Sequence, residues 1–253
     1  ITVKDIEWVV SAGQYSPRPE RKIPPLPRVG YVNGLAVLGP NAGTLIEIEA
    51  TTDKVGTREG KITVTGVVDE EEFGGGGHVM RRKSLVKGSV ENVLTVLRRY
   101  LDFDPRAYDI HINFPGGVPV DGPSAGVAMA CAIFSSLVNV PVNNEVAITG
   151  EVSIHGYVKP VGGVPAKIEA ARRSGARKVL IPSENWQEIF GDIPDIQVIP
   201  LVSVEQALKE ALLFGDITLD TLESKRDGLI KRIGRIEEIT EIKKIDRIEG
   251  ILS

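Results

Sequence analysis

The sequence DGPSAG at residues 121–126 stands immediately before the apolar run VAMACAIFSSLV at residues 127–138. Proline suits the first turn of a helix and glycine allows close backbone approach, so this stretch predicts a buried helix that begins near Ser124. A serine in that place meets unpaired backbone amides and the positive end of the helix dipole, which favour an alkoxide and a neighbouring oxyanion. Ser124 is therefore a candidate nucleophile. The alternative, that it only caps the helix, stays open at this point.

The segments on either side of this helix carry a mixture of strand and helix patterns. Helices are predicted at 84–100, 165–174, 186–189 and 204–213, a hairpin at 151–159, a surface loop at 69–77, and strands at 30–38, 44–50, 61–67, 109–114, 145–149, 178–181 and 196–199. Because the two kinds of element interleave irregularly and hairpins come early, the sequence predicts an α+β fold with a mixed β-sheet and packed helices.

The two ends of the chain differ from this central body. Residues 1–28 combine a short helical pattern with a proline-rich linker, so they are interpreted as the end of a preceding helical domain. Residues 29–214 are the predicted main domain. In residues 215–253 isoleucine recurs at every third position from Ile230 to Ile251. That spacing winds around a helix and does not mark one face, so we expect a helical extension that docks on a neighbour or on the protein's own body.

Composition argues against several functional classes. The hydrophobic fraction of 42% supplies a sizeable core, and the net charge of −4 argues against a nucleic-acid-binding surface. No apolar run reaches the roughly 18 residues of a membrane span and no secretory signal is visible, so we expect a cytoplasmic protein without a membrane partner. Cys131 is interpreted as a core residue. The sequence shows no zinc-site spacing and no P-loop, so neither a metal nor a nucleotide cofactor is expected in this chain.

A nucleophilic serine needs a base, and Lys167 is the best-placed candidate. It lies near the start of a predicted helix, where the dipole and partial burial disfavour the ammonium and lower its pKa. A neutral lysine can take the proton of Ser124. Thr149, at the end of a predicted strand, is expected to orient the lysine through a hydrogen bond. His111 and His155 are the alternatives for a Ser-His-Asp arrangement, but their places in a strand and a turn favour structural roles.

Taken in order, these motifs resemble the proteolytic domain of the Lon family. The separation of 43 residues between Ser124 and Lys167 also matches the Ser–Lys dyad of that family. The resemblance covers about residues 31–213 and is closest to the bacterial LonB and LonC subfamilies. It rests on DGPSAG at 121–126, TGE at 149–151, the GG…K motif at 162–167 and KVLIP at 178–182.

The resemblance implies a fold of the ribosomal-protein-S5-like superfamily and a serine endopeptidase. Ser124 is the implied nucleophile, Lys167 the implied general base and Thr149 a supporting hydroxyl. The implied oxyanion hole consists of the backbone amides of Ser124 and of Gly122 or Asp121. The resemblance further implies hydrolysis of unfolded or damaged proteins in protein quality control, by a hexameric ring of identical chains.

An attached ATPase module usually feeds such a ring, so ATP and magnesium are expected only in a linked module and not in this chain. Two other functions stay open. One is a catalytically silent Lon-like ring that scaffolds another module, which the presence of both Ser124 and Lys167 disfavours. The other is a small-molecule kinase of the same broad fold, which the shortness of the loop at 121–126 disfavours.

Overall fold

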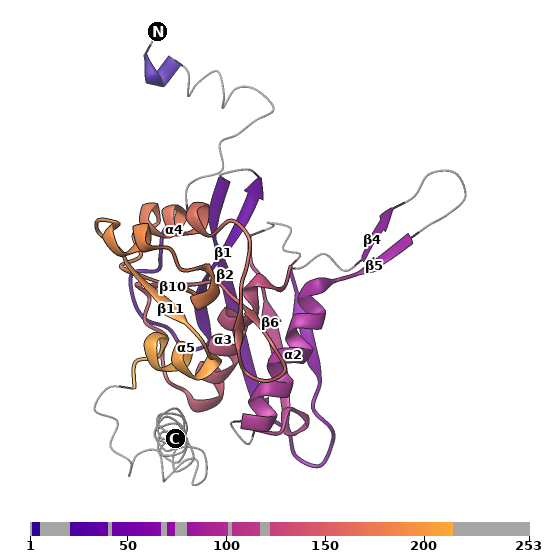
Figure 1. Cartoon of the computed structure of the whole chain (residues 1–253). Helices are drawn as coiled ribbons and strands as arrows, with labels where there is room; N and C mark the ends of the chain where they lie inside the picture. The colour runs from indigo at the N-terminus through magenta and orange to yellow at the C-terminus, as the bar shows by residue number, and fades with distance from the viewer. Residues whose placement is uncertain are drawn as a thin grey trace, which may run out of the picture.

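The computed structural model describes residues 2–5, 21–39, 42–66, 70–73, 80–100, 103–116 and 122–214 (Figure 1). The helices and strands within these residues, with short 3-10 helices marked η, are β1 (Tyr31–Gly39), β2 (Ala42–Lys54), β3 (Ile62–Thr65), β4 (Glu70–Phe73), β5 (Met80–Lys83), α2 (Leu85–Tyr100), η1 (Pro105–Ala107), β6 (Tyr108–Asn113), η2 (Pro123–Ala125), α3 (Gly126–Val138), β7 (Val146–Ile148), β8 (Glu151–Val152), β9 (Val158–Lys159), α4 (Val164–Arg173), β10 (Lys178–Pro182), η3 (Ser183–Asn185), η4 (Glu188–Asp192), β11 (Gln197–Leu201) and α5 (Val204–Ala211).

A seven-stranded sheet in the order β11-β10-β7-β1-β2-β6-β3 forms the centre of the molecule. β2 pairs antiparallel with β1 and β6, whereas β7 pairs parallel with β1 and β10. β10 and β11, and β3 and β6, are also parallel pairs. The predicted α+β fold with a mixed sheet is therefore confirmed. Within the described residues no helix has the length and hydropathy needed to cross a membrane.

Helices cover both faces of this sheet and produce two hydrophobic cores. α2, α3 and α5 pack on one face, and α4 packs on the other. Because strand side chains alternate between faces, Ile46 and Ile48 of β2 contribute to the first core and Leu45 contributes to the second. α3 is buried along almost its whole length, with Ser136 the exception, which agrees with the apolar run that predicts it.

Close contact between the β1–β2 hairpin and α4 leads to a prediction about stability. A Cβ atom on Gly43 would lie 2.1 Å from the carbonyl oxygen of Ala166, on the first turn of α4. Gly43→Ala is therefore expected to lower the free energy of unfolding by about 1–3 kcal/mol, measured by urea denaturation. Gly39→Ala is the matched control in the same hairpin, because a Cβ there meets no atom within 4 Å. Equal stability of the two variants would contradict this packing.

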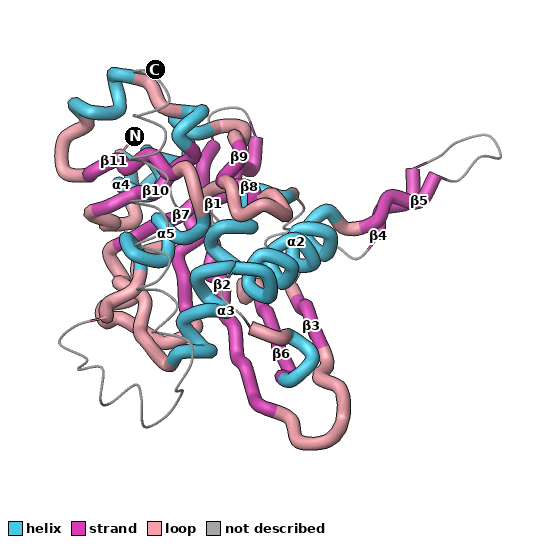
Figure 2. The backbone as a smooth tube through the Cα atoms, turned by 60° about the horizontal axis from the view of Figure 1, so that its bottom comes forward, coloured by secondary structure: helices cyan, strands magenta, loops and turns pink. Residues whose placement is uncertain are grey.

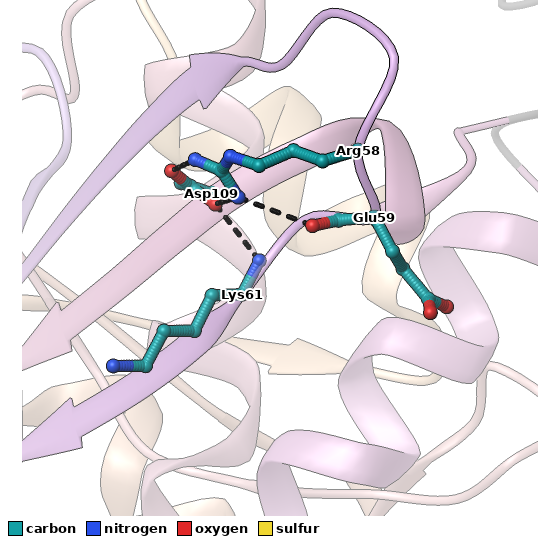
Figure 3. Close-up of polar contacts among 4 residues, drawn as sticks. All are labelled: Arg58, Glu59, Lys61 and Asp109. Carbon is teal, nitrogen blue, oxygen red and sulfur yellow. Dashed lines mark hydrogen bonds and ion pairs between the residues drawn. The ribbon is translucent and has the colours of Figure 1, made fainter.

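The connection between β2 and β3 is fixed to the first residues of β6 through Asp109. Arg58 Nη1 donates a hydrogen bond to Asp109 Oδ1 at 2.9 Å, and the Lys61 amide donates to the same oxygen at 2.8 Å (Figure 3). Arg58 Nη1 also donates to the carbonyl oxygen of Glu59 at 3.1 Å. The hydrogen bond from Arg58 lowers the pKa of Asp109 to about 2. These contacts hold the edge strand β3 in register beside β6.

Two local predictions are wrong. The loop predicted at 69–77 contains β4, which pairs antiparallel with β5 and projects from the body as a two-stranded arm (Figures 1 and 2). An acidic run carries no period-two signal, so its pairing with a strand further along the chain is not visible locally. The helix predicted at 186–189 is replaced by η3 and η4, which flank Trp186 and Gln187. Of the predicted end segments, most of 1–20 and all of 215–253 lie outside the described residues.

Candidate active site

Two helix N-termini meet at the carboxyl end of β7. α3 follows the 3-10 turn η2, which carries Ser124, and α4 carries Lys167 in its first turn. Thr149 is the first residue after β7. Since α3 and α4 cover opposite faces of the sheet, the site forms where the two helical layers come together around one strand end. The three residues predicted to act together are thus brought to the same place by three different elements.

Main-chain hydrogen bonds hold the serine turn against the segment that follows β7. The Gly150 amide donates to the Ser124 carbonyl oxygen at 2.9 Å, and the Val127 amide donates to the Gly150 carbonyl oxygen at 3.1 Å. Thr149 Oγ1 donates to the Ser124 carbonyl oxygen as well, at 3.3 Å. A side chain on Gly150 would collide with Val127, because a Cβ there would lie 2.7 Å from Val127 Cγ2. The position of Ser124 is therefore fixed by the backbone that follows β7.

Ser124 does not occupy a helix-capping position. The N-cap of η2 is Gly122 and the N-cap of α3 is Ala125, and neither position has a side-chain capping hydrogen bond. Ser124 lies between them and is half-buried. The structure therefore does not support the alternative in which this serine is only a cap.

Lys167 is almost completely buried, with 1% of its surface exposed. Its Nζ donates a hydrogen bond to Thr149 Oγ1 at 3.0 Å. Burial disfavours the charged ammonium and lowers the pKa of Lys167 from 10.5 to about 8. A lysine with this pKa is present in part as the free amine near neutral pH, the form that can accept a proton.

Thr149 connects the lysine to the serine turn. Its buried hydroxyl accepts the hydrogen bond from Lys167 Nζ and donates its own to the Ser124 carbonyl oxygen. Between the described residues, no hydrogen bond joins Lys167 Nζ to Ser124 Oγ directly. The amine, the threonine hydroxyl and the serine turn thus form one hydrogen-bonded chain, in which Thr149 sets the direction of the lysine side chain.

Backbone amides at the start of α3 are suited to bind an anion. Neither the Gly122 amide nor the Ser124 amide donates a hydrogen bond to another residue in the described part of the chain. Gly122 has φ 157° and ψ 153°, and a Cβ there would meet no atom within 4 Å. Asp121, the other candidate for the oxyanion hole, lies outside the described residues.

The two histidines and the cysteine that the sequence offers as alternatives make contacts of other kinds. His111 of β6 shares a hydrogen bond of 3.0 Å with Thr65 Oγ1, and His155 lies in the exposed turn between β8 and β9. Cys131 is buried inside α3, and burial raises the pKa of its thiol to about 12. Across the described ranges, no three His, Cys, Asp or Glu residues are grouped so that they could hold a metal ion.

Two polar residues of α2 support the site and were missed from the sequence. Ser89 Oγ donates to the Pro123 carbonyl oxygen at 3.5 Å, and Asn92 Nδ2 donates to the Val152 carbonyl oxygen at 3.4 Å. Both bonds are long, but they place the serine turn and β8 against the same helix. The only local signal is that Ser89 falls on the buried face of an otherwise apolar helix pattern.

Comparison with known proteins identifies relatives of the whole described body. The profile of the Lon protease (S16) C-terminal proteolytic domain matches residues 1–214. The chain is 53% identical over 213 residues to Lon protease 2 of Bacillus subtilis, covering 84% of this chain and 38% of that protein. It is 36% identical over 211 residues to the archaeal Lon protease of Thermococcus kodakarensis, covering 81% and 30%. This chain therefore spans less than two fifths of the length of these relatives.

Proposed function

Because this chain belongs to the Lon protease family through its C-terminal proteolytic domain, we propose that it is a serine endopeptidase with a Ser–Lys dyad. Ser124 is the nucleophile and Lys167 is the general base. The observation that carries this proposal is the buried Lys167, with a pKa of about 8 and a hydrogen bond to Thr149 Oγ1, which itself bonds the serine turn. These features support the proposal, because a lysine of suitable pKa is linked through Thr149 to the turn that carries Ser124.

In the first step of the proposed reaction, Ser124 Oγ attacks the carbonyl carbon of a peptide bond. The neutral amine of Lys167 takes the hydroxyl proton, and the oxygen of the substrate carbonyl becomes an oxyanion. The amides of Ser124 and of Gly122 or Asp121 bind this oxyanion. When the tetrahedral intermediate collapses, the Lys167 ammonium returns the proton to the departing amine and an ester to Ser124 remains.

Water completes the cycle by hydrolysing this ester. The free amine of Lys167 takes one proton from the attacking water, and the second tetrahedral intermediate collapses with release of the new carboxylic acid, which loses its proton to solvent. The ammonium then returns its proton to Ser124 Oγ. No metal or organic cofactor takes part in either step, since the residues of this chain supply the nucleophile, the base and the oxyanion donors.

Unfolded or damaged proteins and peptides are the proposed substrates, because an extended chain can present its peptide bonds to a half-buried serine. We further propose a cytoplasmic homo-oligomer, a hexameric ring fed by an ATPase module that binds ATP and magnesium. The division into an N-terminal segment 1–28, a proteolytic domain 29–214 and a helical extension 215–253 also stays a prediction.

The two alternative functions fit the site less well. A silent scaffold has no use for a buried lysine that is linked through Thr149 to the serine turn, and keeping an ammonium out of water costs free energy. A small-molecule kinase needs a loop that binds phosphate, and membership in a peptidase family argues against that activity.

Labelling with a fluorophosphonate probe tests the proposal. The probe is expected to modify Ser124 and no other serine, and to react faster at pH 8 than at pH 6. The reason is that the neutral fraction of Lys167 grows about tenfold per pH unit below its pKa of about 8. Mass spectrometry of the tryptic peptide locates the label, and Ser124→Ala is the unlabelled control. Absence of label at Ser124 between pH 8 and 9 would falsify the dyad.

A further inference from the structure

Residues 21–24, called the strap here, precede the sheet and belong to no helix or strand. The strap contacts two separate elements. One is the pair Pro115-Gly116, just after β6 on the path to the serine turn, and the other is the C-terminal end of α4, whose first turn carries Lys167. The strap therefore touches both of the chain segments that lead to the proposed dyad.

On the serine side the contact is made by the guanidinium of Arg21. Its Nη1 and Nη2 donate to the Pro115 carbonyl oxygen at 3.3 and 3.4 Å, and Nη2 donates to the Gly116 carbonyl oxygen at 3.1 Å. Gly116 has φ 98°, and a Cβ there would lie 1.7 Å from Arg21 Nη2, so the guanidinium fills the space that a side chain would need. In the sequence, only residues 117–121 separate Gly116, which Arg21 binds, from Gly122 at the start of the serine turn.

On the lysine side the strap satisfies carbonyl oxygens at the end of α4. Lys22 Nζ donates to the Arg173 carbonyl oxygen at 2.6 Å, and the Ile23 amide donates to the Ser174 carbonyl oxygen at 3.1 Å. The last carbonyls of a helix lack partners within the helix, and a cation there is favoured by the dipole. Because α4 is a rigid helix of ten residues, holding its last turn also holds Lys167 in its first turn.

The strap is itself anchored to the sheet at a third point. Pro24 is buried, and its carbonyl oxygen accepts a hydrogen bond from Asn144 Nδ2 at 2.8 Å. Asn33 of β1 in turn donates from Nδ2 to the Asn144 carbonyl oxygen at 2.8 Å. Ile23 packs against the second core, beside α4. These contacts fix the strap relative to the central sheet. The strap can therefore hold both Pro115-Gly116 and the C-terminal end of α4 in place.

We infer that the strap positions Ser124 and Lys167 relative to each other, and that Arg21 is a positioning residue for the serine turn. The inference rests on the proposed function, since the dyad is what the strap would align. A guanidinium that binds two successive carbonyl oxygens fixes a loop more tightly than a single bond, because two donors of a planar group define direction as well as distance. A small displacement of a reacting group costs a large factor in rate.

Arg21→Gln is the first test, with casein hydrolysis as the readout. We expect kcat to fall roughly tenfold and KM to change less than about twofold, because the variant shifts the dyad and leaves substrate contacts in place. Arg21→Lys should recover part of the rate, since it keeps one charged donor. Arg28→Gln is the matched control a few residues along, where the guanidinium lies over the Tyr31 ring, 5.4 Å from its centroid, and contacts neither dyad segment. An Arg21→Gln enzyme with unchanged kcat would overturn the inference and leave the proposed function standing.

Amide hydrogen exchange tests the strap separately from catalysis. In Arg21→Gln, peptides covering residues 122–127 should exchange faster than in the unmodified chain, whereas peptides of α5 should not change. In Lys22→Met the faster exchange should instead appear at residues 170–176. Unaltered exchange at 122–127 in Arg21→Gln would overturn the inference whether or not the chain cleaves casein. Failure of the unmodified chain to cleave or label would count against the proposed function alone.

Discussion

Replacing Ser124 with alanine is expected to lower the hydrolysis of casein by this chain by at least about a thousandfold. The loss should be this large because the oxyanion donors and the base cannot act without an attacking oxygen. Cys131 of α3 cannot take its place, because this thiol is buried and burial raises its pKa to about 12. Release of acid-soluble peptides, followed over hours, gives the range needed to measure so large a change.

Stability should not change with this substitution. Ser124 is half-buried, and its turn is held by main-chain bonds that alanine keeps, so the thermal midpoint should stay within about 2 °C. Ser136→Ala, in the α3 helix that follows the serine turn, is the matched control, because the Ser136 hydroxyl lies 3.0 Å from Thr52 Oγ1 and away from the site. That variant should keep full activity. Undiminished cleavage by Ser124→Ala would remove Ser124 from the mechanism.

Much of the fold could be predicted from the sequence, because apolar residues recur along a helix or strand at the spacing of the side chains that face the core. The apolar run at 127–138 predicts α3, and the alternation at 44–50 predicts the centre of β2, because each pattern reports which side chains face a core. β4 could not be predicted in this way. Its run of three glutamates becomes a strand through pairing with β5, and such pairing depends on residues elsewhere in the chain.

In the candidate site, too, the sequence indicates some features and leaves others hidden. The motifs around Ser124, Thr149 and Lys167 mark strand ends and helix starts, and their resemblance to the Lon family is what indicates a shared site. The contacts that orient them are not local. Arg21 reaches Pro115 across 94 positions of sequence, and Ser89 reaches Pro123 across 34. Neither pair carries a sequence pattern, since each depends on how the layers pack.

Lys167→Met is expected to reduce casein hydrolysis by at least about a hundredfold at pH 8 while making the protein more stable. Methionine has a similar length and no charge, so it fills the buried site without the cost of desolvating an ammonium. Thr149 keeps its hydrogen bond to the Ser124 carbonyl oxygen. Lys178→Met is a surface control on β10, where the ammonium bonds Glu210 Oε2 at 2.8 Å, and it should leave the rate unchanged.

The role of Lys167 can be tested most sharply through the pH dependence of the hydrolysis rate and of the free energy of unfolding. In the unmodified chain the rate should rise with pH to a plateau, half-maximal at pH about 8, because the active form of Lys167 is the neutral amine. The folded pKa lies below the ordinary value of 10.5, so between pH 8 and 10.5 the unfolded chain binds more protons and the free energy of unfolding rises with pH. Lys167→Met should therefore be more stable by about 1–3 kcal/mol below pH 8, with the advantage shrinking toward pH 10. A stability difference that does not depend on pH would show that Lys167 titrates normally in the folded protein, and it could not then serve as the base.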